Sequence, residues 1–441
     1  WVLDELSAEQ REMIMRRAEQ DIRDVSEVVR PIIEDVRQRG DAALIDYAAK
    51  FDKSQIKGSL KATDEDFEKA YEQLDPDITD AIRICAENVR IHHQQQMDRV
   101  EMQWMDEVRP GQFAGEKITP IPSAGLYVPR GKGAFPSVMY MLCTPAVIAG
   151  VKNIAVCTPP TPDGGIDAAS LVAADICGVR NVYKAGGAQA IAALAYGTET
   201  VPKVTQVNGP GNPYVAAAKR LLSDIINPGM PAGPSEAIIL ADHTADPWNT
   251  ALDLLNEQEH GPDSASVLVT PSRELAEQVI AYLPEIIASL PPQRQEFCAA
   301  GFQKYGGVML CKDMEQAIEF CNEYAVEHLL MKVENTDGVL DQLVNTGEIL
   351  IGETTPIVMG NFGIGINAVL PTGQKAQTHD CTSVWAFLKR TSLSYVNAQG
   401  YAALKDPVTK LAHYEGFDGH AKVIEDRNES VFSDIRLRKA S

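Results

Sequence analysis

Residues 153–177 read NIAVCTPPTPDGGIDAASLVAADIC: an apolar run, a turn rich in proline and glycine, and then an alanine-rich segment. The short apolar run predicts a buried strand, and the alanine-rich segment predicts a helix. The same pairing recurs between residues 125 and 223, where further strands are expected over 125–128, 181–183 and 204–207. Four strand–helix pairs in about 100 residues predict a parallel sheet covered by helices on both faces.

A second series of strand and helix patterns follows the first. Apolar runs predict strands over residues 237–241, 266–270, 307–310 and 348–351. Between them, helical patterns cover residues 247–259, 273–283 and 314–322. We therefore expect an α/β protein with two parallel sheets. Charged helices should precede the sheets, where Ile32, Ile33 and Val36 have helical spacing, and a charged helical tail should follow Trp385.

The composition is that of an acidic globular chain. Its 441 residues, at about 150 per domain, predict two or three domains. It has 40 Lys and Arg against 61 Asp and Glu, a formal net charge of −21. Phosphate backbones and anionic lipid repel such a chain, so nucleic-acid and membrane partners are not expected. A local basic pocket for a small anion is compatible with this charge.

Cysteine usage and apolar segments predict a cytoplasmic location. The eight cysteines are scattered and form no CxxC pair, which argues against a disulfide framework or a cysteine-based zinc site. Residues 1–20 lack the apolar core of a secretory signal. The most apolar stretch, residues 136–151, is too short to span a bilayer.

Three glycine-rich segments follow expected strands, at residues 127–133, 186–189 and 209–212. None is a complete GxGxxG motif, and each alone could be a tight strand-to-helix turn. Ligands of parallel sheets bind at the carboxyl ends of the strands, beside the amino ends of the following helices. Three such segments in one sheet therefore favour a cofactor site.

Two pairs of residues are candidate metal ligands. Glu257 and His260 are spaced i, i+3 on an expected helix, so they share a face and could bind one ion. Glu415 and His420 in the tail offer the same donors for a metal or a substrate. The alternatives are a solvated surface pair for the first and an ordinary loop for the second.

The remaining histidines divide into one candidate and several that we interpret as structural. Glu327 and His328 are adjacent at a segment junction, where they form either an acid/base pair or a capped turn. His92 and His93 are expected on a solvated helix face, and His243 in a loop.

Taken together, six segments resemble the histidinol dehydrogenase family. They are residues 209–215 (GPGNPYV), 232–236 (AGPSE), 253–264 (DLLNEQEHGPDS), 327–329 (EHL), 370–373 (LPTG) and the pair Glu415 and His420. They occur in family order over residues 20–430. The resemblance implies two incomplete Rossmann-like domains, an N-terminal helical part and a C-terminal helical tail that is swapped in a dimer.

The resemblance also implies domain boundaries. It assigns residues 1–24 to an N-terminal helical segment and residues 386–441 to the tail. The first α/β domain, with the metal and catalytic residues, would combine residues 25–126 and 237–385. The second, NAD-binding domain would be residues 127–236.

Members of this family are zinc-dependent homodimers that use two NAD molecules to oxidise a primary alcohol through the aldehyde to the carboxylate. By position, the resemblance assigns NAD binding to Tyr127, Gln189 and Asn212. It assigns the catalytic pair to Glu327 and His328.

The expected zinc ligands depart from the family pattern of Gln, His, Asp and His. Here they would be Glu257, His260, Asn361 and His420, the last donated across the dimer. One carboxylate is gained and one is lost, so the set keeps two imidazoles, one carboxylate and one amide. This compensation predicts that zinc is retained.

The expected substrate site departs as well. Ala368 stands where the family has a substrate-contacting His, and Lys375 and His379 follow in place of small residues. These basic groups are either surface charges or part of an anion pocket. The second interpretation indicates the branch that oxidises 2,3-dihydroxypropane-1-sulfonate (sulfopropanediol) to 3-sulfolactate.

Two other functions remain open at this point. Ser235 and Glu415, at substrate-contacting positions of the family, keep histidinol dehydrogenase as the alternative. The other is a non-catalytic zinc-stabilised dimer, in which Glu327 and His328 would form a turn without a catalytic role. The preserved charge of the metal site argues against this function.

Overall fold

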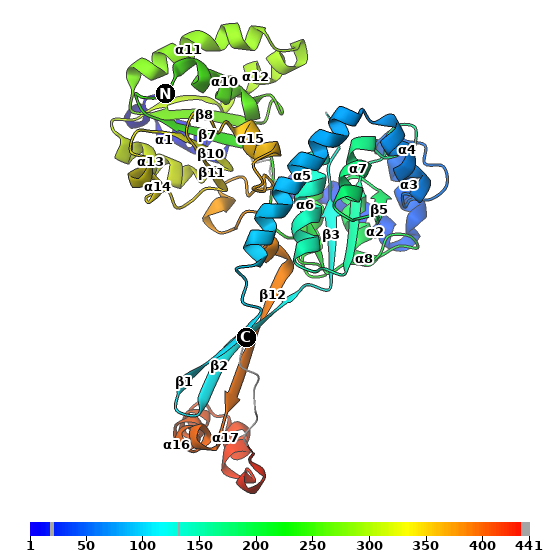
Figure 1. Ribbon diagram of the computed structural model, residues 1–441, viewed down its shortest axis with the longest axis vertical. Helices are drawn as coiled ribbons and strands as arrows, with labels where there is room; N and C mark the ends of the chain where they lie inside the picture. Colours follow the sequence, from blue (N-terminus) through cyan, green and yellow to red (C-terminus); the bar gives the residue numbers. More distant parts are fainter. Residues whose placement is uncertain (18–21, 131–132, 434–441) are drawn as a thin grey trace. The chain divides into compact units, whose positions relative to one another are not determined.

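The computed structural model describes residues 1–17, 22–130 and 133–433 (Figure 1). The chain divides into two compact units. The first contains Trp1–Gln96 and Ile121–Phe387, and the second contains Met97–Pro120 and the chain from Leu388 onward. The first unit holds the two parallel sheets that the sequence predicts, so the α/β fold class is confirmed.

The first sheet has four parallel strands in the order β5-β4-β3-β6. The strands are β3 (Ser123–Tyr127), β4 (Asn153–Thr158), β5 (Val182–Lys184) and β6 (Gln206–Asn208). Each is followed by one helix: α6 (Pro136–Ile148), α7 (Ala168–Ile176), α8 (Gly187–Tyr196) and α9 (Pro213–Leu221). These elements confirm the predicted strand–helix pairs. The order places a topological switch point between β3 and β6, where such sheets bind ligands.

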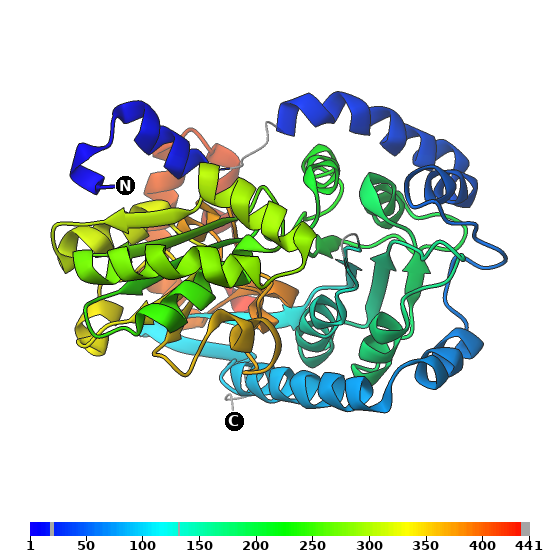
Figure 2. The same cartoon turned by 90° about the horizontal axis from the view of Figure 1, so that it is seen from above.

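Helices from the start of the chain complete this layer. They are α2 (Ile22–Arg39), α3 (Asp41–Phe51), α4 (Asp64–Gln73) and α5 (Pro76–Met97). Helix α2 lies along α8 and α9 (Figure 2), and its Val29 and Ile33, with Leu44 of α3, join the apolar core of this sheet. Residues 25–62 thus pack on the sheet of residues 123–208, whereas the sequence analysis grouped them with residues 237–385. An amphipathic pattern shows that a helix buries one face, but not which sheet it covers.

The second sheet has five parallel strands in the order β11-β10-β7-β8-β9. The strands are β7 (Glu236–Ala241), β8 (Ala265–Thr270), β9 (Gly307–Leu310), β10 (His328–Lys332) and β11 (Glu348–Ile351). One face is covered by α1 (Ala8–Arg16), α13 (Met314–Tyr324) and α14 (Thr336–Leu340), and the other by α10 (Pro247–Gln258), α11 (Arg273–Ala288), α12 (Pro292–Lys304) and α15 (Ile357–Phe362). Short 3-10 turns are η1 (Leu3–Glu5), η2 (Lys375–Gln377), η3 (Val384–Phe387) and, in the second unit, η4 (Glu429–Val431). The predicted strands are present, and β10 is an additional one.

The second unit contains an antiparallel sheet that the sequence did not predict. Its strands are β1 (Gln103–Arg109), β2 (Gln112–Pro120) and β12 (Leu388–Val396), in the order β1-β2-β12. Helices α16 (Ala398–Tyr414) and α17 (Asp418–Glu425) follow. The expectation of a wholly helical tail was therefore wrong for its first residues. Most side chains of β12 are exposed, so pairing with β2 rather than an apolar pattern defines this strand.

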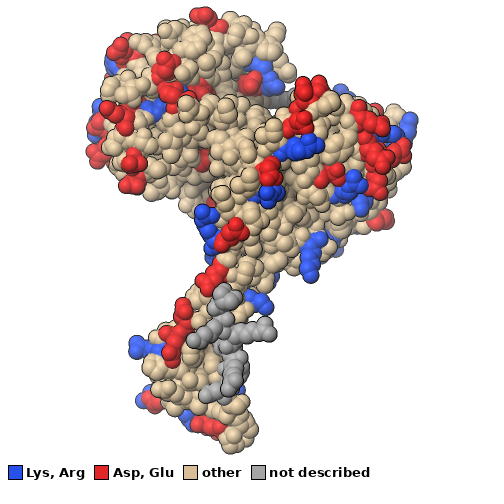
Figure 3. All heavy atoms as spheres, in the orientation of Figure 1, with Lys and Arg blue, Asp and Glu red and all other residues tan. Residues whose placement is uncertain are grey.

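Several expectations about single residues can be compared with the fold. All eight cysteines are free, as expected. His93 is fully buried rather than solvated, and its Nδ1 lies 2.8 Å from the carbonyl oxygen of Val89. Burial lowers the pKa of His93 to about 4. Figure 3 shows Asp and Glu side chains spread over one face, with Lys and Arg between them. Among the described residues, no helix is long and apolar enough to cross a membrane.

Candidate active site

The three residues expected to bind NAD lie at the carboxyl end of the first sheet. Tyr127 is the last residue of β3, and its hydroxyl oxygen accepts a hydrogen bond of 3.0 Å from the amide of Gly187, where α8 begins. Gln189 is buried in the first turn of α8. Asn212 is the exposed N-cap of α9 and accepts a bond of 3.1 Å from the amide of Val215. Two helix amino ends and one strand end thus meet at this edge, a suitable geometry for phosphate groups.

The loop before α9 has a glycine for a steric reason. Gly209 has φ +120°, and a Cβ there would lie 2.0 Å from the carbonyl oxygen of Tyr127. The buried Lys219 donates a hydrogen bond of 2.9 Å from Nζ to the carbonyl of Gly209, and burial lowers the pKa of Lys219 to about 7. In the first glycine-rich segment, Gly131 and Lys132 lie outside the described residues.

The expected catalytic residues lie at the amino end of the second sheet. Glu236, His328 and Glu348 are the first residues of β7, β10 and β11. In the strand register, His328 is opposite Glu348 on one side and Ala237 on the other. Parallel pairing therefore gathers a carboxylate and an imidazole that are 20 residues apart in the sequence.

His328 is surrounded by carboxylates. Its Nδ1 is hydrogen-bonded to Oε1 of Glu348, while its Nε2 lies 3.7 Å from Oε1 of Glu327 and 4.0 Å from Oε1 of Glu257. Burial alone would lower the pKa of His328, but the three carboxylates outweigh it and raise the pKa to about 10. The Nε2 distances are too long for direct hydrogen bonds, so this nitrogen is available to a substrate hydroxyl.

Glu327 is held from the side opposite His328. Its Oε2 accepts a hydrogen bond of 3.1 Å from the amide of Glu236. The carboxylate of Glu236 in turn binds Nη1 of Arg17 at 2.6 Å and accepts a bond of 3.0 Å from the amide of Gly373. Burial raises the pKa of Glu327 well above its usual range. A carboxylate with a raised pKa is a suitable general base near neutral pH.

Three of the four expected zinc ligands lie close together. Oε2 of Glu257 is 3.3 Å from Nδ1 of His260, and Nδ2 of Asn361 donates a hydrogen bond of 2.8 Å to Oε1 of Glu257. Burial would raise the pKa of Glu257, but His260, His328 and the amides outweigh it and lower the pKa. Oε2 of Glu257 and Oδ1 of Asn361 are buried without a hydrogen-bond partner among the described residues. Two orphaned oxygens beside an imidazole are a donor set that suits a divalent cation.

Comparison with known proteins identifies the family. A family model described as histidinol dehydrogenase matches residues 15–428. The chain belongs to the histidinol dehydrogenase family. It is 46% identical over 426 residues to "Histidinol dehydrogenase" of Synechocystis, which covers 96% of this chain and 98% of that protein. It is 48% identical over 426 residues to "Histidinol dehydrogenase homolog 2" of Mesorhizobium japonicum, with 96% of each chain covered.

A solved structure gives the same result. The crystal structure of histidinol dehydrogenase from Elizabethkingia anophelis matches with a TM-score of 0.91 and 31% identity, and the match covers 97% of each chain. The histidinol dehydrogenase family consists of NAD-dependent, zinc-binding dehydrogenases that form homodimers. The sequence-based assignment to this family and its fold is confirmed.

The other expected site residues differ in their surroundings. Ser235 lies beside the cluster, since its Oγ is 3.1 Å from Nδ1 of His260. Lys375 and His379 are exposed on the segment that follows Gly373, and Nδ1 of His379 is hydrogen-bonded to Thr378. Glu415 and His420 belong to the second unit, where both are exposed.

The described residues contain no group of three His, Cys, Asp or Glu side chains arranged to hold a metal. Within the first unit the proposed set contains one imidazole and one carboxylate, of His260 and Glu257, and the third donor, Asn361, is an amide. Zinc binding would require the imidazole of His420 to be added.

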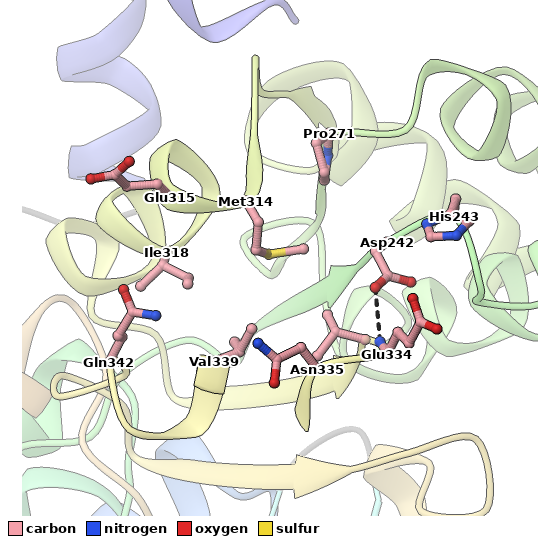
Figure 4. A pocket seen from close by; sticks show the side chains of 11 residues that line it. Asp242, His243, Pro271, Met314, Glu315, Ile318, Glu334, Asn335, Val339 and Gln342 are labelled. Carbon is pink, nitrogen blue, oxygen red and sulfur yellow. Dashed lines mark hydrogen bonds between the residues drawn. The ribbon is translucent and has the colours of Figure 1, made fainter. Parts of the chain in front are cut away.

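A cavity of about 520 Å³ lies at the opposite end of the second sheet (Figure 4). Asp242 and Glu334, which follow β7 and β10, line it, and the amide of Glu334 donates a bond of 2.8 Å to Oδ2 of Asp242. His243, expected in a loop, does lie in one and also lines the cavity. The cavity is separate from His328, which begins β10 at the other end.

The sequence analysis missed three residues of the candidate site: Arg17, Glu236 and Glu348. Glu236 was quoted within a family segment but without a role. Arg17 stacks on the ring of Tyr324 at 3.5 Å from the guanidinium carbon to the ring centroid, a contact between residues 307 apart. The available signal was a single acidic residue at the start of each apolar run, at positions 236 and 348. Charged residues are rare in buried strands.

Proposed function

We propose that this histidinol dehydrogenase family member oxidises the primary alcohol of 2,3-dihydroxypropane-1-sulfonate through the aldehyde to 3-sulfolactate. Two NAD molecules each accept one hydride, and water supplies the second oxygen of the carboxylate. The observation that carries the proposal is Ala368, which removes an imidazole from the substrate site, together with the added Lys375 and His379. An ammonium and an imidazole suit a sulfonate.

His328 is proposed as the base of the first oxidation. Its Nε2, 3.7 Å from Glu327 and 4.0 Å from Glu257, has room for the substrate hydroxyl. The three carboxylates favour the imidazolium, and a zinc ion held by Glu257 would offset their charge and so favour the neutral ring that accepts the hydroxyl proton. As the O–H bond breaks, the carbinol carbon loses its hydride to the bound NAD, and the aldehyde forms. Tyr127, Gln189 and Asn212 are the residues proposed to hold the NAD.

Glu327 is proposed as the base of the second oxidation. Its buried carboxylate takes a proton from water, whose oxygen adds to the aldehyde carbon, while His328 returns its proton to the aldehyde oxygen, so that a gem-diol forms and His328 is again neutral. The gem-diol then loses its hydride to a second NAD and its hydroxyl proton to His328, and the carboxylate remains. The amide of Glu236 keeps Glu327 oriented during these proton transfers.

Glu257, His260 and Asn361, completed by His420, would hold the zinc ion. When bound, zinc supplies a Lewis acid that orients and polarises the substrate oxygens. The buried, partnerless oxygens of Glu257 and Asn361 support this set. The ion would also offset the negative charge that Glu257, Glu327 and Glu348 concentrate around His328.

The second unit is proposed to serve the partner subunit, so that each active site contains residues from two chains. Beside Glu415 and His420, the tail exposes large apolar side chains: Leu411 is 60%, Tyr414 89%, Phe417 52% and Val423 56% exposed. Large apolar side chains exposed over one short stretch of the chain support a role in a protein interface.

Substrate comparison tests the proposal. NADH formation is measured with zinc-loaded enzyme on sulfopropanediol, histidinol and uncharged glycerol-like diols. Sulfopropanediol should give two NADH per molecule and a kcat/KM at least about tenfold above histidinol. Lys375→Ala should raise KM for sulfopropanediol and leave the value for uncharged diols unchanged.

The second candidate is oxidation of histidinol, which is favoured by the carboxylates around His328 and by Ser235 beside His260. A cationic amino alcohol suits such a site. Equal or better turnover of histidinol would overturn the sulfonate proposal in favour of this one.

A further inference from the structure

Glu348 is a buried carboxylate for which the proposed reaction has no direct use. It begins β11, its side chain is 6% exposed, and its Oε1 is hydrogen-bonded to Nδ1 of His328. Its other oxygen, Oε2, is buried without a partner among the described residues. A buried carboxylate costs free energy unless it interacts with a charged or polar group, and His328 is the group that Glu348 contacts. This contact therefore indicates a role for Glu348 at His328.

The backbone makes this contact a fixed feature of the sheet. The amide of Glu348 donates a hydrogen bond of 3.0 Å to the carbonyl of Glu327, and the parallel register places His328 opposite Glu348. Gly347 permits this close pairing, since a Cβ there would lie 2.5 Å from the carbonyl oxygen of Glu327. The two side chains therefore leave the sheet side by side.

The helix above the sheet also leaves space for this carboxylate. A Cβ on Gly360 of α15 would lie 3.3 Å from Oε1 and 3.4 Å from Oε2 of Glu348. A larger residue at position 360 would press on the carboxylate. Gly360 also immediately precedes Asn361, one of the proposed zinc ligands. The same turn of α15 therefore lies against the Glu348 carboxylate and carries a proposed zinc ligand.

The consequence for His328 concerns its orientation and the proton on Nδ1. A carboxylate that accepts the Nδ1–H bond holds the ring and directs Nε2 to the opposite side. On that side are Glu327 at 3.7 Å and Glu257 at 4.0 Å, where the substrate hydroxyl is expected. Without Glu348, the ring could rotate or carry its proton on Nε2, which would remove the base.

We propose that Glu348 is a positioning residue that fixes His328 through its Nδ1–H, so that Nε2 faces the substrate. The proposal rests on the proposed catalytic role of His328. The carboxylate and the imidazole are held together by the register of two neighbouring strands, β10 and β11.

The test combines kinetics with a direct observation of the His328 ring. Proton spectra of zinc-loaded enzyme, labelled with ¹⁵N-histidine, should contain a strongly downfield Nδ1–H signal that is absent from His328→Asn. Glu348→Gln, which is similar in shape, should lose or markedly shift this signal. It should also lower kcat by about 10–100-fold, the range seen when outer-shell partners of such groups are removed, with KM changed less than about threefold.

A matched control is the partner of Lys332, which lies at the other end of β10 from His328. Asp253 forms an ion pair with the buried Lys332, the last residue of β10, and Lys332 keeps Glu353 as a second partner at 2.8 Å. Asp253→Asn therefore removes a carboxylate of comparable burial without touching His328. It should leave both the downfield signal and kcat unchanged.

The outcomes separate this proposal from the proposed function. If wild-type enzyme has no such signal, or if Glu348→Gln keeps both the signal and kcat, the positioning role is wrong. If the signal depends on Glu348 but His328→Asn is fully active, the catalytic role of His328 is wrong instead. Should Glu348→Gln not fold, Glu348→Met, which removes the buried charge, is used for the same comparison, and the wild-type signal remains decisive.

Discussion

The buried ion pair between Arg17 and Glu236 gives the sharpest prediction about stability. The side chains are 4% and 3% exposed, and Nη1 and Oε2 are 2.6 Å apart. Arg17 also donates to the carbonyl of Tyr324 and stacks on its ring. Arg17→Met would keep most of the apolar packing and remove the charge, leaving the carboxylate of Glu236 buried without its cation.

The expected cost is about 3–5 kcal/mol, the usual range when one partner of a buried ion pair is removed. Solvent does not reduce this value appreciably, because neither side chain is accessible. Glu236→Gln should cost a similar amount, since it leaves the guanidinium unpaired. The double variant removes both charges and should cost at least about 2 kcal/mol less than the sum of the single variants.

Urea unfolding of the four proteins at one fixed protein concentration measures this cycle, with fluorescence and circular dichroism as parallel probes. A control is Arg11→Met, which breaks an exposed ion pair with Glu323 and should change stability by less than about 1 kcal/mol. Additive single effects, or a cost of Arg17→Met below about 1 kcal/mol, would refute the reasoning.

Three further predictions concern other parts of the chain. Burial raises the pKa of the half-buried Asp52 to about 6, so its ionised carboxylate opposes folding above that pH, whereas the protonated form below about pH 4 does not. Asp52→Asn should therefore raise the melting temperature at pH 8 but not at pH 4. An equal change at both pH values would contradict this assignment. Glu257→Gln should lose zinc in elemental analysis, and adding Asn361→Asp should restore it by returning one carboxylate; zinc retained in Glu257→Gln would show that other ligands hold it. Mixed dimers of inactive His328→Asn and His420→Ala should regain activity, because one of their two sites carries neither change; confirmed subunit exchange without activity would refute the shared site.

The two parallel sheets could be predicted from sequence because their strands are buried on both faces. Strands such as β4 and β8 are therefore continuous apolar runs, bounded by proline, glycine or aspartate. The antiparallel sheet could not be predicted in this way, because the side chains of β1 and β12 are largely exposed. Strand β1 forms a local hairpin with β2, whereas β12 pairs with β2 from a position far away in the sequence.

The active-site cluster was predictable only in part, for a related reason. Glu257 and His260 are neighbours in sequence, and their i, i+3 spacing indicated a metal site on one helix face. Helix α10 ends at Gln258, so His260 lies in the turn that follows, where its Nδ1 is 3.3 Å from Oε2 of Glu257. The contact between His328 and Glu348 depends on strand register, which no local pattern encodes. Likewise, Arg17 reaches Glu236 across 219 residues, and nothing near Arg17 indicates a buried partner.

The charges of the candidate site are consistent with the metal ligands proposed above. Glu236 is paired with Arg17, Glu348 is bonded to His328, and Glu327 accepts a hydrogen bond from the amide of Glu236. Of the four, Glu257 is the one whose pKa is lowered, and its buried Oε2, 3.3 Å from Nδ1 of His260, has no hydrogen-bond partner among the described residues. Because the other three carboxylates are already engaged, replacing Asn361 by a second acidic ligand would add an uncompensated charge. The exchange of carboxylate and amide between positions 257 and 361 therefore keeps the number of carboxylates in the cluster unchanged, which is consistent with a buried site that cannot accommodate another negative charge.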